Sequence, residues 1–167
     1  MIILSVVVTL FFTRPGRAFP RGAPAEACES LLPRHYGTEP KDSEHSPYSF
    51  LASSSHYHYM MDGIQVQLTG PRFKGFLIAA MDPDTHERIG EWYKVKGTST
   101  LPCSAISHAD PLPKKRVILL WKPPKDRPKG EVIFVATVLE HYGEYYSGIV
   151  AGIPPSQEEE EEDDSYD

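Results

Sequence analysis

A series of short β-type segments, separated by turn residues, constrains the fold of this chain most strongly. In residues 64–68 apolar and polar side chains alternate without a break, as they do in a strand with one buried face. Residues 132–139 form a long segment that is rich in β-branched side chains. Five more segments have β-type composition: 48–51, 73–81, 89–95, 117–121 and 145–150. Because no convincing amphipathic helix separates them, the sequence predicts an all-β fold, an antiparallel immunoglobulin-like β-sandwich of about seven to eight strands.

The N-terminus resembles a secretory leader. Residues 2–12 form an apolar run of 11 residues, whereas a membrane-spanning helix needs about 20. Such a run has the length of a signal-peptide core, and Gly16 and Ala18 supply the small residues of a cleavage site before Phe19. We therefore expect a signal peptide over 1–18, a secreted, extracellular mature chain and no membrane span. A retained anchor is the alternative, because no positive charge precedes the run.

The acidic residues are concentrated at the C-terminus. Residues 158–167 hold eight of the 23 acidic residues, and the leader holds two of the 17 basic ones, so the part between them carries 15 of each. A block of like charges repels itself and buries little apolar surface. We expect one folded domain over 19–153 and a disordered acidic tail over 154–167. Nucleic acid is an unfavourable partner for a secreted chain with this charge balance.

The two cysteines, Cys28 and Cys103, lie 75 residues apart. An even count in a secreted chain favours a disulfide, and closing a loop of this length contributes about 4–5 kcal/mol in the chain-entropy model. His108 follows Cys103 by five residues, which leaves two alternatives, a catalytic thiol and a zinc site. A nucleophilic thiol also needs an orienting group, and structural zinc needs more ligands than this pair provides.

Other chemistry has little support in the sequence. There is no phosphate-binding glycine loop, no nucleophile-elbow serine and no telling pair of carboxylates, so we expect a non-enzymatic protein without a cofactor. His56 and His58 would share one face of a strand and are the best metal candidates. Because no third ligand accompanies them, we expect solvent-facing histidines and no metal site.

Cationic residues gather between residues 114 and 129, where Asp126 is the only acid. The five that we select as a candidate contact for an anionic ligand are Lys114, Lys115, Arg116, Lys122 and Lys125. This cluster favours glycosaminoglycan or acidic microbial polymers as partners. Two alternatives are ordinary solvated lysines on a strand flank and a patch that the acidic tail masks. Four aromatic residues are candidates for an exposed sugar-binding surface, although packing against the core is the commoner role: Trp92, Tyr142, Tyr145 and Tyr146.

Several ordered motifs resemble the reelin (reeler) domain family. They are FPRGAPAEAC, LLPRH, FKGFLIAA, CSAISH, VILLWKPP and GEVIFVATVLEHYGEYYSGIV, and they run from Phe19 to Ile153. The combination of FKGF, IGEW, CSAISH and TVLEHYG is most similar to the small secreted insect defense proteins of this family. The resemblance implies a disulfide between Cys28 and Cys103. Larger family members include membrane ferric-chelate reductases, whose activity we do not transfer to this chain.

Two functions follow from the resemblance and the charge pattern. The first is a secreted innate-immune defense protein, with antimicrobial cellular responses or binding to microbial polysaccharide or lipopolysaccharide as its activity. The second is an extracellular-matrix protein that engages matrix glycans or calcium. In both cases we expect a monomer.

Overall fold

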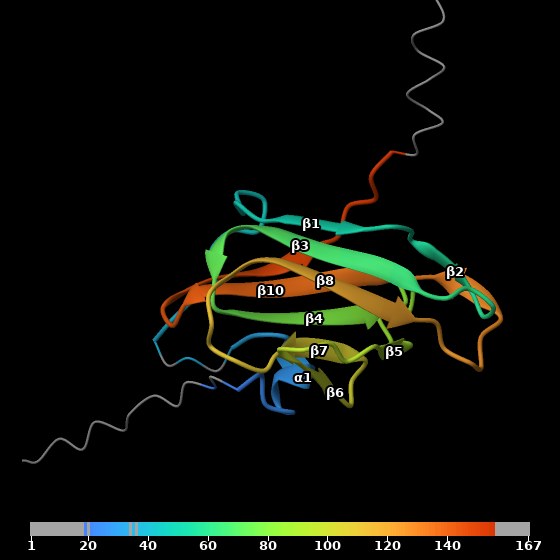
Figure 1. Ribbon diagram of the computed structural model, residues 1–167, viewed down its shortest axis with the longest axis horizontal. Helices are drawn as coiled ribbons and strands as arrows, with labels where there is room; N and C mark the ends of the chain where they lie inside the picture. Colours follow the sequence, from blue (N-terminus) through green and yellow to red (C-terminus); the bar gives the residue numbers. More distant parts are fainter. Residues whose placement is uncertain (1–18, 20, 34, 36, 156–167) are drawn as a thin grey trace, which may run out of the picture.

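The computed structural model describes residues 19, 21–33, 35 and 37–155. The predicted signal peptide and residues 156–167 of the predicted tail lie outside the described residues. The described chain forms two antiparallel sheets packed face to face, together with a small two-stranded ribbon and one short helix (Figure 1). The prediction of an all-β antiparallel sandwich is confirmed.

The first sheet has four strands, in the order β1-β3-β8-β5. Their bounds are Ser49–Ala52 (β1), Ile64–Phe73 (β3), Lys114–Lys122 (β8) and Glu91–Trp92 (β5). The second sheet has five strands, in the order β11-β10-β4-β7-β6. Their bounds are Glu144–Val150 (β11), Ile133–His141 (β10), Gly75–Met81 (β4), Ala105–His108 (β7) and Thr98–Leu101 (β6). The first order corresponds to strands A-B-E-D of an immunoglobulin domain, and β11-β10-β4 corresponds to G-F-C.

Each of the seven expected segments overlaps a strand, and the described residues form four more strands. The ribbon pairs β2 (His56–His58) with β9 (Lys129–Glu131), and β6 and β7 extend the second sheet. The count exceeds seven to eight because these four strands are too short to show an apolar repeat. The one helix formed by the described residues, α1 (Ala27–Ser30), has four residues, so this part of the chain holds no helix long enough to cross a bilayer.

The main core lies between the two sheets. On β3, Ile64, Val66 and Leu68 are fully buried and alternate with more exposed glutamines, as the sequence predicts. Trp121 of β8 lies at the centre, with its ring edge-to-face with Phe134 at 5.6 Å. Aromatic pairs of this geometry stabilise a core beyond the area that they bury.

A second, smaller core lies on the outer face of the five-stranded sheet. All seven residues of β4 are buried because both of its faces are covered. Ile78 contributes to the main core, whereas Leu77 and Ala79 pack with Ala27 and Leu31 of the N-terminal part of the chain. Residues 21–33, here called the cover segment, therefore lie over this sheet face, with α1 beside β7 in Figure 1.

Candidate functional site

The cover segment is fixed to the sheet at several points. A disulfide joins Cys28 to Cys103, with their Cα atoms 5.9 Å apart. The disulfide prediction is confirmed, and Cys103 is therefore not available as a catalytic thiol or a zinc ligand. The Ala23 amide donates to Ser107 Oγ at 3.0 Å, and the Thr137 hydroxyl donates to the Leu31 carbonyl at 2.6 Å.

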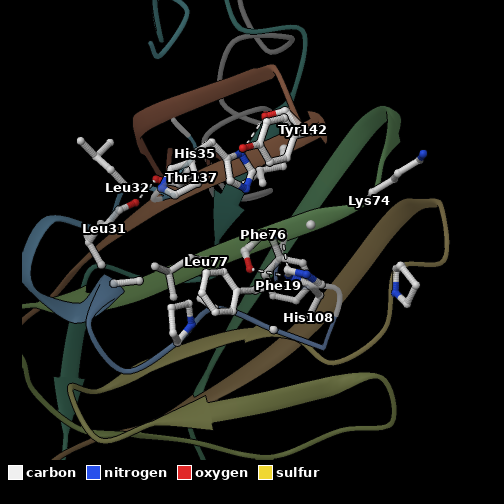
Figure 2. Close-up of a pocket in the computed structure, with 18 of the residues that line it drawn as sticks. Phe19, Leu31, Leu32, His35, Lys74, Phe76, Leu77, His108, Thr137 and Tyr142 are labelled. Carbon is white, nitrogen blue, oxygen red and sulfur yellow. Dashed lines mark hydrogen bonds between the residues drawn. The ribbon is translucent and has the colours of Figure 1, made fainter. Parts of the chain in front are cut away.

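An apolar pocket of about 240 Å³ remains between the cover segment and the sheet (Figure 2). Leu77 of β4 and Leu139 of β10 line it from the sheet side, and Ala27, Leu31 and Leu32 line it from the cover segment. Phe19 and the aromatic ring of Tyr142 also contribute to the lining. Sequence reasoning missed this site, since residues 19–47 look like an irregular lead-in. The apolar residues Phe19, Leu31 and Leu32 in that lead-in are the signal that could have indicated it.

Basic side chains accompany the apolar lining. His108 is 7% exposed, and its Nδ1 accepts a hydrogen bond from the Phe76 amide at 3.2 Å. Burial lowers the pKa of His108, against the opposing effect of the backbone hydrogen bond with Phe76, and so favours the neutral form of the imidazole. His35 stacks on Tyr142 with ring centroids 4.2 Å apart, and its Nδ1 lies 2.7 Å from the Tyr142 carbonyl oxygen. Lys74, the single residue between β3 and β4, is also in the lining and is exposed.

The structure divides the predicted basic cluster into two groups. Lys114, Lys115 and Arg116 begin β8, whereas Lys122 ends it and Lys125 follows. Eight residue steps along a strand correspond to about 26 Å, so one small ligand cannot contact both groups. Lys122 Nζ instead lies 5.9 Å from the ring centroid of Tyr93.

Two members of the first group, Lys114 and Arg116, border a groove of about 270 Å³ at the open edge of β8, here called the edge groove, whereas Lys115 is exposed and is not in its lining. Arg116 and Lys114 line it together with Lys96, which the sequence analysis missed because it lies 18 residues earlier. Lys114 is partly neutralised, since its Nζ lies 2.8 Å from Asp110 Oδ1, and this hydrogen bond lowers the pKa of the Asp110 carboxyl. Arg116 donates to the side-chain oxygen of Gln67 at 2.7 Å and remains exposed. The groove therefore carries two available cations, Lys96 and Arg116.

The predicted histidine pair lies on β2, and both side chains are exposed. His58 is opposite Lys129, and His56 Nε2 lies 3.3 Å from Glu131. No group of three metal-ligating residues occurs in the described ranges. A lysine facing one histidine also disfavours a cation, so we assign no metal to this pair.

The four aromatic candidates do not form one surface. Trp92 is buried, and its indole N–H donates to the Ser104 carbonyl at 2.9 Å. Tyr145 is also buried, and Tyr146 packs against the main core. Tyr142 is 39% exposed and belongs to the apolar pocket. The aromatic residues other than Tyr142 therefore serve the core.

The fold and these sites define a class of protein, a small disulfide-tethered β-sandwich with an apolar pocket beneath its N-terminal segment. The reeler domain model matches residues 26–162, and the chain belongs to the reeler domain family. The reeler domain of human F-spondin has a similar fold, with a TM-score of 0.57 at 16% identity over 76% of this chain and 99% of that one.

Two kinds of relatives are similar in sequence. "Putative defense protein 3" of Antheraea mylitta is 29% identical, over 88% of this chain and 90% of that protein. "Putative ferric-chelate reductase 1 homolog" of Drosophila melanogaster is 30% identical over 89% of this chain. The match covers 25% of the length of that reductase relative.

Proposed function

We propose that this chain is an extracellular, monomeric and non-enzymatic defense protein that binds anionic polymers of microbial surfaces through the edge groove. The observation that carries the proposal is the gathering of Lys96 and Arg116 at the open edge of β8, beside a Lys114 already paired with Asp110. Among the described residues neither Lys96 nor Arg116 forms an ion pair. Two such cations on one groove attract a repeating polyanion, and the attraction weakens with salt.

Similarity over most of the chain supports the defense role. The insect defense protein relative matches over nearly its full length, whereas the reductase relative matches over a quarter of its own. We therefore do not extend reductase activity to this chain. The disulfide supports an extracellular site of action, because such bonds persist in oxidising compartments.

Binding to deacylated lipopolysaccharide tests the groove, since the polymer then carries no acyl chain. We expect Lys96→Glu with Arg116→Glu to weaken this binding at least tenfold at 50 mM salt. The matched control, Lys122→Glu with Lys125→Glu, makes the same charge change at the other end of β8 and should leave the affinity within twofold. Neutral β-glucan should bind more weakly than the anionic polymer. Equal losses in both double variants would contradict a site in the edge groove, and no binding to any microbial polymer would contradict the function.

Two further measurements distinguish the matrix hypothesis from the defense hypothesis. Heparin binding stronger than lipopolysaccharide binding would favour a matrix role, as would a calcium response of the chain in the millimolar range. Deletion of residues 158–167 tests whether the acidic tail masks the edge groove. If it does, the variant without the tail should bind the polymer more tightly than the full chain.

A further inference from the structure

The apolar pocket beneath the cover segment is a built cavity rather than a surface depression. The disulfide, the Thr137–Leu31 hydrogen bond and the Ala23–Ser107 hydrogen bond hold its roof at separate points. Small residues lie on both sides of the pocket, with Ala27 in the roof and Gly75 in the floor. A Cβ atom at position 75 would lie 2.9 Å from the His108 ring, so this floor position has no room for a larger residue.

The described residues that line the pocket include basic side chains and no acidic ones. Among the described residues that line it, the ionisable groups other than Tyr142 are Lys74, His35, His108 and His141, and none is a carboxylate. Two acids lie next to the lining without belonging to it. Glu144 is 3.3 Å from His141 and forms an ion pair at 3.0 Å with Lys41, and Asp110 forms an ion pair at 2.8 Å with Lys114. Figure 2 shows the side chain of Lys74, which is exposed, extending from the strand junction away from the other labelled residues. Among the described lining residues, its ammonium is the one permanent charge.

We infer that this pocket binds a single-chain amphiphile, with its aliphatic chain among the leucines and its anionic headgroup at the rim near Lys74. An apolar interior suits an alkyl chain, and a rim with cationic and no acidic side chains suits a carboxylate or phosphate. The volume of about 240 Å³ lies just below the usual range for small-molecule pockets, which begins at roughly 300 Å³. It therefore accommodates one chain and excludes lipids that bring several acyl chains together. The site is independent of the edge groove.

Calorimetric titration with twelve-carbon probes below their micelle concentrations tests the headgroup. The full chain is produced in a eukaryotic secretory host and titrated with dodecanoate, dodecyl phosphate, dodecanol and dodecyltrimethylammonium. We expect saturable binding of one equivalent of the two anionic probes, at least tenfold tighter than that of the cationic one. Dodecanoate and dodecyl phosphate distinguish a fatty carboxylate from a phosphate headgroup. Equal affinity for all four probes, or no binding of any, would overturn the inference.

Two variants locate the binding. Lys74→Glu should weaken dodecanoate binding about tenfold. The same variant should bind the cationic probe at least as tightly as it binds dodecanoate. The control, Lys94→Glu, changes an exposed charge outside the pocket and should leave both affinities unchanged. Leu139→Trp fills the pocket and should abolish binding of all probes, whereas Leu112→Trp places the same side chain at an exposed leucine and should not. Binding that survives Leu139→Trp in a protein with an unchanged circular dichroism spectrum and melting curve would contradict the location.

Methyl chemical shifts of Leu77 and Leu31 provide a second readout. Dodecanoate should shift both resonances while those of Leu119, in the main core, stay in place. If Leu139→Trp unfolds the protein, these shifts in the wild-type chain still decide the location, because unchanged Leu77 and Leu31 resonances at saturation would contradict it. The titration with deacylated lipopolysaccharide reports on the edge groove alone, so either site can fail without the other.

Discussion

The hydroxyl of Thr137, on β10, donates a 2.6 Å hydrogen bond to the carbonyl oxygen of Leu31, 106 residues earlier in the chain. Leu31 ends α1 with a positive φ of 56°, which turns the chain away from the helix. One buried side chain thus satisfies the end of the helix and holds the cover segment to the sheet.

Replacing Thr137 with valine keeps the shape of the side chain and removes this donor. We expect a loss of about 1–3 kcal/mol in the free energy of unfolding, because the Leu31 carbonyl loses its buried partner. Urea denaturation measures the change, and Thr100→Val, at an exposed position of β6, is the control with an expected change within about 0.5 kcal/mol. Equal effects of the two substitutions would show that the hydrogen bond contributes nothing specific.

Removing the disulfide by Cys28→Ser with Cys103→Ser should lower stability by about 2–5 kcal/mol. Because the cover segment packs on its own small core, we expect its amides to lose protection from hydrogen exchange before those of β3 and β10. Hydrogen exchange followed by mass spectrometry gives the order. Simultaneous loss of amide protection in the cover segment and in the sandwich would mean that they unfold as one unit.

Gly90 lies against the central tryptophan. Its φ is +70°, and a Cβ atom there would lie 2.4 Å from the ring of Trp121. We expect Gly90→Ala to cost about 3 kcal/mol, from backbone strain together with displacement of a buried ring. Thermal unfolding measures this cost against Gly143→Ala, at a turn glycine with no atom within 4 Å of the added Cβ. A Gly90→Ala variant as stable as its control would contradict this packing.

The buried imidazole of His108 should make stability depend on pH. Burial lowers its pKa below the usual 6.5, with Lys114 acting in the same direction and Asp110 and the Phe76 backbone opposing. The stability that the neutral His108 imidazole contributes is therefore complete above pH 6.5, the usual pKa of histidine in an unfolded chain. This stability is lost as the pH falls from 6.5 through the lowered pKa of His108 in the folded state. Carboxyls with a lowered pKa, such as those of Asp82 and Asp110, change the stability only at more acidic pH, where they become protonated.

Comparison of urea unfolding at pH 7.5 and pH 5.0 isolates this group. The wild type should lose more stability between the two values than His108→Gln, whose amide oxygen can still accept from the Phe76 amide. Each protein serves as its own reference at pH 7.5, so a general destabilisation by the substitution cancels. Parallel losses in both proteins would rule out His108 as the titrating group.

The sequence predicts the sandwich well because its main strands carry their own signal. Alternation in β3 and the β-branched residues of β10 mark strands whatever they pair with. β2 and β9 have three residues each, HYH and KGE, and exist because each pairs with the other across more than 70 residues of chain. No local sequence pattern indicates a pairing between segments this far apart in the chain.

The sites are less accessible to sequence reasoning than the fold. Residues close in sequence appear as one basic cluster, but an extended strand separates Lys114 from Lys122. Conversely, the edge groove brings Lys96 beside Arg116, and the pocket brings Phe19 beside Leu139. Local composition reveals charge and apolarity, whereas the meeting of distant segments depends on sheet order.

The open edge of β8 has a consequence for association between molecules. β5 pairs with β8 only at Trp121 and Lys122, so in the described structure no strand pairs with that side of β8 from Lys114 to Ile118. A strand border of this kind is a template on which a second copy can add its own strand. Lys114, Lys115 and Arg116 stand along this border, and an identical border brought alongside would carry the same charges. The cations therefore also act against fibre-like growth of the protein, whether or not a polymer occupies the groove.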